Sequence, residues 1–311
     1  MDDPKTRRVW ATVITNLDYL PGLLTLAYSL QRVQSAYPLV ALYTDAFPQA
    51  EGLPLLQARG IPYQRVEAVV PASSRRYEED PRFNDTWTKL VAFTLWDEYD
   101  RVVLLDSDML VRHNMDEIMD LPLDAPGTLH HRIFAASHAC ACNPMKKPHY
   151  PSHWIPSNCA LTAQHPHPDK AQKEAPPSSA GVGMLNSGLL VINPGKPAWA
   201  MIEEALADAD RIEAYNFPDQ ELLSDVFRAR WVALPYVYNA LKTLRLENAH
   251  AAIWKDECVK NVHYIFAHKP WHETREQRAD LSEARKLNSW WWEVTDERKR
   301  QEMERGVVDD Y

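Results

Sequence analysis

The chain has 311 residues, a length that fits either one large α/β domain or two domains of about 150 residues each. Its composition, 45% hydrophobic and 25% charged, is that of a folded globular protein and excludes a disordered or collagen-like chain. The formal net charge of -9 opposes binding to a nucleic-acid backbone, so we expect no nucleic-acid partner. A local basic patch can still bind a small phosphorylated ligand.

The N-terminal segment 1–8 is polar and leads directly into a β-branched run too short to be the apolar core of a signal peptide. The sequence also lacks a run of about 18 apolar residues, so we expect no membrane span. Four cysteines without an export signal indicate reduced thiols rather than a disulfide framework. These features predict a soluble, cytoplasmic protein.

The N-terminal part of the chain predicts alternating strands and helices. Val9–Thr15 and Leu39–Thr44 are short apolar runs typical of buried strands. Between them, apolar residues at three- and four-residue steps from Leu20 to Val33 predict a helix. A short helix ending at Gly60 and a strand over Tyr63–Val70 follow. This alternation predicts a parallel sheet built from βαβ units.

The clearest central strand is Val102–Leu105, preceded by a helix that we expect to be capped at residues 84–86 and to extend to Leu95. The strand stops at Asp106-Ser107-Asp108. Two carboxylates would therefore lie beyond the carboxyl end of a parallel strand, where open α/β sheets bind ligands.

Residues 125–180 are rich in Pro, His, Cys, Ser and Ala, and we expect them to form an irregular insert. Regular structure is predicted to resume after it. The expected elements are a strand over Leu189–Asn193, helices over Pro197–Asp208 and Pro218–Arg228, a strand over Asn261–Phe266 that closes the sheet, and a charged helical tail over Gln277–Glu304 whose Trp290, Trp291 and Trp292 attach it to the body.

Asp106 and Asp108 can share a hard divalent cation, which prefers oxygen ligands and readily bridges to a diphosphate. An ordinary turn after a strand is the alternative, and Asp208-Ala209-Asp210 shows the same spacing at a predicted helix end, where capping is the simpler interpretation. His263 could complete the metal site and Lys269 could bind phosphate, although a buried core histidine is equally compatible with the pattern.

Asn186 and Ser187 offer amide and hydroxyl groups to a sugar, with a simple turn as the alternative. Asp219 and Gln220 open a helix, where Asp219 could also serve only as a cap. The nine glycines form neither of the two common glycine-rich nucleotide motifs, so any nucleotide must be held in another way.

Taken together, these motifs resemble glycosyltransferase family 8, the family of glycogenin and galactinol synthase. The resemblance spans about residues 9–272 and rests on motifs that follow one another in the family's order. They are Ala11-Thr12-Val13-Ile14-Thr15-Asn16 with Tyr19, Thr88-Lys89-Leu90, Asp106-Ser107-Asp108, Leu185-Asn186-Ser187-Gly188, Asp219-Gln220, and His263 with Lys269-Pro270-Trp271.

The resemblance implies a GT-A type α/β fold, a single nucleotide-binding domain over 1–275 with a mostly parallel twisted central sheet flanked by helices. Residues 125–180 would be an acceptor-side insert and 276–311 a helical tail. It also implies a UDP-sugar donor, UDP-galactose or UDP-glucose, and Mn²⁺. By this resemblance, Thr15, Asn16, Tyr19 and Ser107 would bind uridine and ribose. Asp106, Asp108 and His263 would bind the metal, Lys269 would bind the diphosphate, and Lys89 would approach the sugar or phosphate. The hexose would be bound by Asn186, Ser187, Asp219 and Gln220.

Two positions depart from glycogenin-like chains. Phe266 stands where those chains carry Gly, which puts a backbone contact to phosphate in doubt, and Asn216 stands where they carry Asp. Residues 239–262 contain no tyrosine, so self-glucosylation at the position used by glycogenin is excluded. The insert and the tryptophan-rich tail resemble galactinol synthases and indicate a small acceptor such as myo-inositol.

The implied reaction is a transfer of galactose or glucose with retention of configuration. Same-face attack and a double displacement with Asp219 or Gln220 as nucleophile both remain open. A glycogenin-like glucosyltransferase and a noncatalytic UDP-sugar-binding protein are the alternative functions, and the oligomeric state, including a homodimer, is left open.

The insert also permits a zinc site formed by Cys140, Cys142 and Cys159 with His138, His149 or His153. The single residue between the first two cysteines argues against it, because paired zinc thiolates usually have two to four residues between them. We therefore favour an acceptor-side loop packed with small thiols and aromatic rings.

Overall fold

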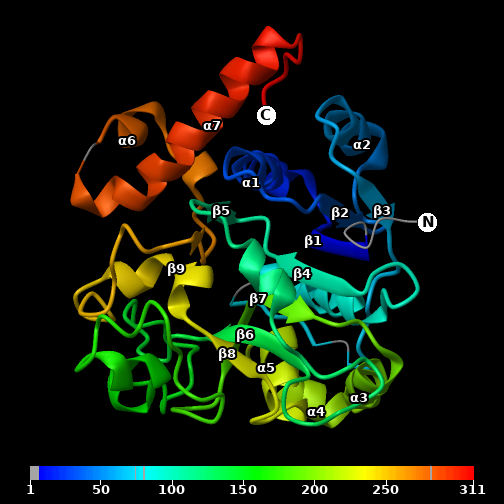
Figure 1. The fold of residues 1–311 in the computed structure, drawn as a ribbon, viewed down its shortest axis with the longest axis vertical. Coiled ribbons are helices and arrows are strands. Elements are labelled where there is room, and N and C mark those ends of the chain that lie inside the picture. Colours follow the sequence, from blue (N-terminus) through cyan, green and yellow to red (C-terminus); the bar gives the residue numbers. More distant parts are fainter. Residues whose placement is uncertain (1–6, 74, 80, 281) are drawn as a thin grey trace.

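In the computed structural model, which describes residues 7–73, 75–79, 81–280 and 282–311, a seven-stranded sheet crosses the middle of the molecule (Figure 1). The strand order is β3-β2-β1-β4-β7-β6-β8. Neighbouring strands are parallel except β7, which runs antiparallel to β4 and β6, so the expected mostly parallel α/β sheet is confirmed. The strands are β1 (Arg8–Ile14), β2 (Leu39–Tyr43), β3 (Tyr63–Arg65), β4 (Arg101–Leu105), β6 (Phe134–His138), β7 (Leu185–Ile192) and β8 (Val232–Leu234).

Helices cover both faces of this sheet (Figure 1). Alternate side chains of a strand point to opposite faces, so Val9 and Ala11 of β1 join one hydrophobic core while Trp10 and Ile14 join the other. Because both faces are buried, the central strands β1 and β4 are mostly apolar, as predicted. On one face lie α1 (Leu20–Arg32) and α2 (Gln49–Ala58), and on the other lie α3 (Lys196–Leu206), α5 (Pro218–Val226) and a 3₁₀ helix (Pro81–Thr94), with the short α4 (Ala209–Ala214) joining α3 to α5.

A second, three-stranded sheet has the order β5-β10-β9 and consists of β5 (Met109–Val111), β10 (Asn261–His263) and β9 (Ala240–Leu241). The prediction that residues 261–266 close the main sheet was therefore wrong. β10 instead pairs antiparallel with β5, the strand that directly follows Asp106-Ser107-Asp108. A strand of three residues that is stabilised by a distant partner shows no recognisable pattern in its own sequence, so its pairing could not be predicted.

The insert is not irregular throughout, because β6 lies within residues 125–180 and is an inner strand of the main sheet. Its sequence, Phe-Ala-Ala-Ser-His, has no β-branched residue and little strand propensity. Pairing with β7 on one side and β8 on the other stabilises it instead. β7 begins at Leu185, so Asn186 and Ser187 lie inside a strand, at a register shift against β6, rather than in a turn before it.

Two further elements differ from prediction. β3 ends at Arg65 because β2, its only strand partner among the described residues, ends at the paired residue Tyr43. The helix expected to be capped at residues 84–86 is a 3₁₀ helix that already begins at Pro81. Within it, Asn84 Nδ2 donates to Pro81 O, and Thr86 and Thr94 donate to carbonyls three residues earlier, so these side chains bond inside the element.

The tail forms α6 (Arg275–Ala279) and the longer α7 (Lys286–Glu304), which packs against α1 (Figure 1). Trp291 is buried in a third hydrophobic core, to which Leu110, Trp154 and Val262 also belong. Thr295 forms a buried hydrogen bond of 2.9 Å with Thr25. Glu302 accepts hydrogen bonds from Arg59 and Arg298, and all three side chains are at most 6% exposed. Among the described residues, no helix has both the length and the apolar composition needed to span a bilayer.

This buried ion pair predicts the effect of a substitution in the tail. Glu302→Gln should lower the free energy of unfolding by about 3 to 5 kcal/mol, because the buried guanidinium of Arg298 loses its counter-ion and that of Arg59 loses one of its two, keeping Asp309. Glu304→Gln, on the exposed side of the same helix, is the matched control and should change stability little. Urea denaturation of both variants checks this, and equal midpoints would contradict it.

Candidate active site

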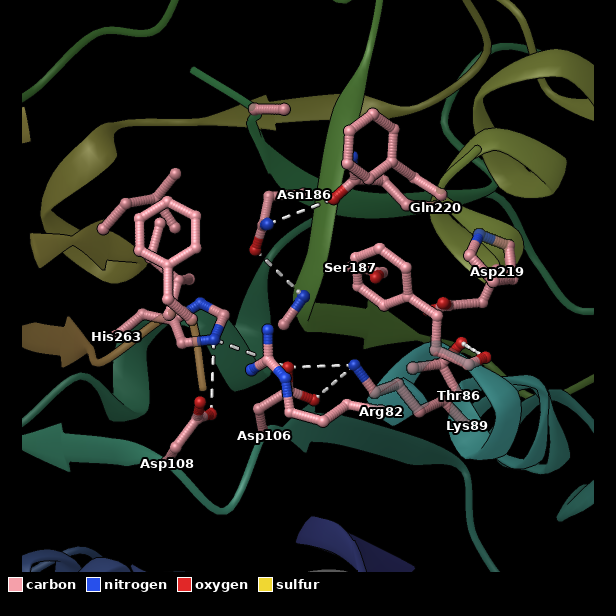
Figure 2. Close-up of a pocket in the computed structure, with 18 of the residues that line it drawn as sticks. Arg82, Thr86, Lys89, Asp106, Asp108, Asn186, Ser187, Asp219, Gln220 and His263 are labelled. Atoms are coloured by element: carbon pink, nitrogen blue, oxygen red, sulfur yellow. Dashed lines mark hydrogen bonds and ion pairs between the residues drawn. The ribbon is translucent and has the colours of Figure 1, made fainter. Parts of the chain in front are cut away.

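A pocket opens at the carboxyl ends of β1 and β4, and nearly all residues expected to be functional line it (Figure 2). Lys269 is the exception: it lies behind the pocket and is 1% exposed. The pocket-lining residues come from strands of the main sheet, the 3₁₀ helix Pro81–Thr94, α5 and the second sheet. The expected residues that line the pocket are Thr15, Asn16, Tyr19, Lys89, Asp106, Ser107, Asp108, Asn186, Ser187, Asp219, Gln220 and His263.

Asp106, Asp108 and His263 converge although the histidine is far from the two acids in sequence. Antiparallel pairing places His263 opposite Met109, and Tyr264 N donates to Asp108 O at 2.9 Å. His263 Nε2 lies 3.5 Å from Asp106 Oδ2 and 3.3 Å from Asp108 Oδ1. The three ligand atoms lie within 4.8 Å of one another. This group of two carboxylates and one imidazole could hold a hard divalent cation.

Two lysines compensate the negative charge of this buried group. Lys89 Nζ lies 2.7 Å from Asp106 Oδ1, and Lys269 Nζ forms an ion pair with Asp108 Oδ2. Burial alone would raise the pKa of Asp106, but the charges of Lys89 and His263 outweigh it, so this pKa is lowered. Burial likewise opposes the ionised form of Asp108, and Lys269 with His263 brings its pKa well below the ordinary value. Both carboxylates are therefore charged and ready to act as ligands.

Two residues that sequence reasoning did not single out position His263. Asn239 Oδ1 lies 2.9 Å from His263 Nδ1, which leaves Nε2 directed at the carboxylates. Metal-binding histidines are commonly oriented by such a bond at the second ring nitrogen. At Gly188, a Cβ atom would lie 2.3 Å from His263 Cε1, so only glycine leaves room for the ring. The residues present therefore fit a bound cation, and a single sequence carries no signal for either supporting role.

The segment after β1 forms the other side of the pocket. Tyr19 makes an edge contact with Trp271 at 6.0 Å, and Lys269 Nζ lies 5.6 Å from the centre of the Tyr19 ring. Burial, with a smaller contribution from the charge of Asp108, raises the pKa of Tyr19 to about 12, so the phenol stays neutral. Asn16 Oδ1 is buried without a hydrogen-bond partner among the described residues. A polar atom left unpaired in this way is available to a ligand.

Asp219 and Gln220, in the first turn of α5, form the third side together with Asn186 (Figure 2). Asn186 Nδ2 donates to Gln220 Oε1 at 3.1 Å, while Asn186 Oδ1 accepts from Asn239 Nδ2 at 2.8 Å. Asp219 is 3% exposed, and within the described part of the chain its Oδ2 has no hydrogen-bond partner. Sequence reasoning also missed Arg82 and Thr86, which line the pocket (Figure 2).

The insert contributes the remaining wall, with Asn143, Met145, Tyr150 and Trp154 facing the pocket. Trp154 stacks on Phe217 with ring centres 4.7 Å apart, which ties this wall to the residue before α5. The outer part of the pocket is thus aromatic and apolar, in contrast to the charged floor.

Of the two positions that depart from glycogenin-like chains, Phe266 is the more informative. Its φ is +74°, in the left-handed region that glycine adopts without strain. The chain therefore adopts a conformation here that glycine favours, although the residue is not glycine. The other position, Asn216, donates its backbone N–H to Glu221 and lies on the approach to α5.

Comparisons with known proteins agree with this arrangement. The chain is similar in fold to two solved glycosyltransferase structures. It spans 65% of GlyE from Streptococcus pneumoniae (TM-score 0.57, 17% identity, 97% of this chain) and 96% of the galactosyltransferase LgtC in complex with donor and acceptor sugar analogs (TM-score 0.55, 15% identity, 93% of this chain). Fold and site therefore define a GT-A glycosyltransferase fold, as the sequence predicted.

The family model for glycosyl transferase family 8 matches residues 12–275, and the chain belongs to this family. Similar curated proteins include galactinol synthase 4 of Arabidopsis thaliana, 28% identical over 93% of this chain and 81% of that protein. Galactinol synthase 1 of Ajuga reptans is 28% identical over 90% and 78%.

The close approach at Gly188 gives a direct test of the candidate metal group. Gly188→Ala should displace the imidazole of His263 and weaken Mn²⁺ binding about 10- to 100-fold, the usual effect of disturbing a residue that orients a ligand. Titration calorimetry with Mn²⁺ measures it. Gly127→Ala is the control, because a Cβ there meets nothing within 4 Å, and equal affinities in the two variants would contradict the assignment.

Proposed function

We propose that this protein is a retaining hexosyltransferase that moves galactose or glucose from a UDP-sugar to a hydroxyl group of a small acceptor such as myo-inositol. One observation carries the proposal: Asp106, Asp108 and His263 converge on the floor of a pocket whose other walls bear the residues expected to bind nucleotide and hexose. The family membership and the similarity to galactinol synthases support it.

Asp106, Asp108 and His263 would hold Mn²⁺ in this proposal. When bound, the cation would stabilise the negative charge that develops on the departing diphosphate. Lys269 adds positive charge from behind Asp108, and Lys89 does so beside Asp106. These fixed charges need no rearrangement during the reaction, which is the main advantage of a preorganised site.

The two ends of the donor fit the two sides of the pocket. Thr15, Asn16 and Ser107 would contact uridine and ribose, with the neutral ring of Tyr19 stacked on the base. On the opposite side, Asn186, Ser187, Asp219 and Gln220 would surround the hexose. The unpaired Oδ2 of Asp219 is available to a sugar hydroxyl, whereas Gln220 Oε1 is already bonded to Asn186.

If the reaction uses a protein nucleophile, these contacts favour Asp219 over Gln220. Same-face attack needs no such nucleophile, because the departing phosphate oxygen can accept the proton of the acceptor hydroxyl.

The pocket wall formed by the insert favours a small acceptor molecule. The wall formed by Tyr150 and Trp154 brings aromatic side chains to the pocket, against which the C–H groups of a cyclic polyol can pack. The region that in glycogenin carries the self-modified tyrosine has none here, which removes the reason to favour a glycogenin-like reaction.

The proposal is tested by measuring UDP release from UDP-galactose and from UDP-glucose with Mn²⁺, with and without myo-inositol. We expect release from one of the two donors that rises when myo-inositol is present, together with formation of an α-linked product by NMR. Tight UDP binding without turnover on any polyol or sugar would instead identify a noncatalytic binding protein.

Replacing Asp108 tests the metal group within this function. Asp108→Ala should reduce turnover about 100- to 1000-fold, the usual effect of losing one contact that stabilises charge in the transition state. Asp210→Ala is the matched control, since Asp210 belongs to an acidic pair of identical spacing next to Asp208, which caps α4. An Asp108→Ala variant with an unchanged rate would reject the assignment of Asp108.

A further inference from the structure

A second group of metal-ligating side chains lies in the insert, apart from the acidic pair. Cys140 and Cys142 follow β6, Cys159 lies further along the insert, and His250 comes from the segment before β10. The four ligand atoms lie within 4.8 Å of one another and all four residues are buried. His250 Nε2 is 3.2 Å from Cys142 Sγ and 3.3 Å from Cys159 Sγ.

None of the three histidines considered from the sequence belongs to this group. His138, for example, bonds to Pro176 O at 3.0 Å. His250 lies 91 residues beyond Cys159, so spacing in the sequence could not indicate it. The single residue between Cys140 and Cys142 does not prevent metal binding, because the other two ligands, Cys159 and His250, come from separate segments.

His250 is oriented as a ligand would be. Its Nδ1 lies 2.9 Å from His165 Nε2, so the second ring nitrogen has a partner and Nε2 faces the sulfurs. The ring is fully buried, with 0% exposed surface. A buried imidazole directed at three thiols has no obvious purpose in a purely apolar core, where a free cysteine acts as a small hydrophobic residue.

The donor chemistry distinguishes this group from the acidic one. Three thiolates and one imidazole are a frequent ligand set for structural zinc, which is bound by four protein ligands in a closed tetrahedral site. Two carboxylates and an imidazole leave positions open for a substrate. A single disulfide among the three cysteines would leave one thiol and the histidine unexplained, and all four cysteines of the chain are free thiols.

We propose that Cys140, Cys142, Cys159 and His250 bind one Zn²⁺ and thereby attach the insert to the segment before β10. Hydrogen bonds run between the same two regions, from Asn248 Nδ2 to Pro144 O and from Gln172 Nε2 to Ile253 O. Because Asn143 and Tyr150 line the pocket, the zinc site also fixes one wall of it. That last consequence rests on the proposed function, whereas zinc binding does not.

The test is the metal content of the full chain, purified after growth with added zinc and measured by mass spectrometry of the elements. We expect one zinc per chain that survives dialysis against a mild chelator. Asp108→Ala should keep this zinc, which separates the site from the acidic group. The double variant Cys142→Ser/Cys159→Ser should lose about nine tenths or more of it, whereas Cys258→Ser, which removes the cysteine outside the group, should not.

A second measurement keeps the test valid if the double variant fails to fold. Wild-type protein prepared with Co²⁺ in place of zinc should show the visible absorption of a tetrahedral thiolate site. A strong chelator should remove the metal and lower the unfolding temperature of the wild-type protein. A chain free of zinc, an iron–sulfur chromophore, or a disulfide found by counting thiols after denaturation would overturn the proposal. None of these outcomes depends on transferase activity.

Discussion

The candidate active site depends on the pairing of β10 with β5, because this pairing brings His263 next to Asp106 and Asp108. β5 begins directly after Asp108, and the antiparallel register sets His263 opposite Met109. On the other side, Asp106 N donates to Gly188 O, so the acidic turn is bonded to β7 as well. Two carboxylates so close together, one buried and one partly exposed, would repel each other, and the positive charges of Lys89 and Lys269 make the arrangement stable. A cation bound there would add its positive charge to that of the two lysines, which already neutralise the carboxylates.

Sequence patterns were sufficient to predict the elements whose formation depends on their own residues. The apolar run of β4, its abrupt end at two aspartates, and the apolar stripe of α1 follow from periodicity and burial, and all were predicted. β6 and β10 were not, because an alanine-rich strand and a three-residue strand are stabilised by their partners rather than by their own residues. The same limit explains Asn239 and Gly188, whose importance comes from the position of His263 in space.

Phe266 shows that a residue with a side chain can take a backbone conformation that glycine favours. The phenylalanine in place of glycine puts a backbone contact to phosphate in doubt, and its φ of +74° lies in the left-handed region that glycine adopts readily. A residue with a side chain costs about 1 to 2 kcal/mol in this region. The ring of Phe266 lies within 5.2 Å of Lys147 Nζ and 5.9 Å of Lys242 Nζ, contacts that a glycine could not make and that partly offset this cost.

The insert raises a physical problem that the rest of the fold does not. From Ala139 to Met184 its only helices are the short 3₁₀ turns at Pro156–Asn158 and Ala160–Gln164. Ordering the backbone costs about 1 to 2 kcal/mol per residue, and few regular hydrogen bonds repay it here. The buried residues of the third core, such as Trp154 and Leu161, supply part of what is needed. A metal held by three ligands from the insert and by His250 from outside it would add stability at the point where the chain is least regular. In this view the oxygen-rich group serves the reaction and the sulfur-rich group holds the surface on which the acceptor is placed.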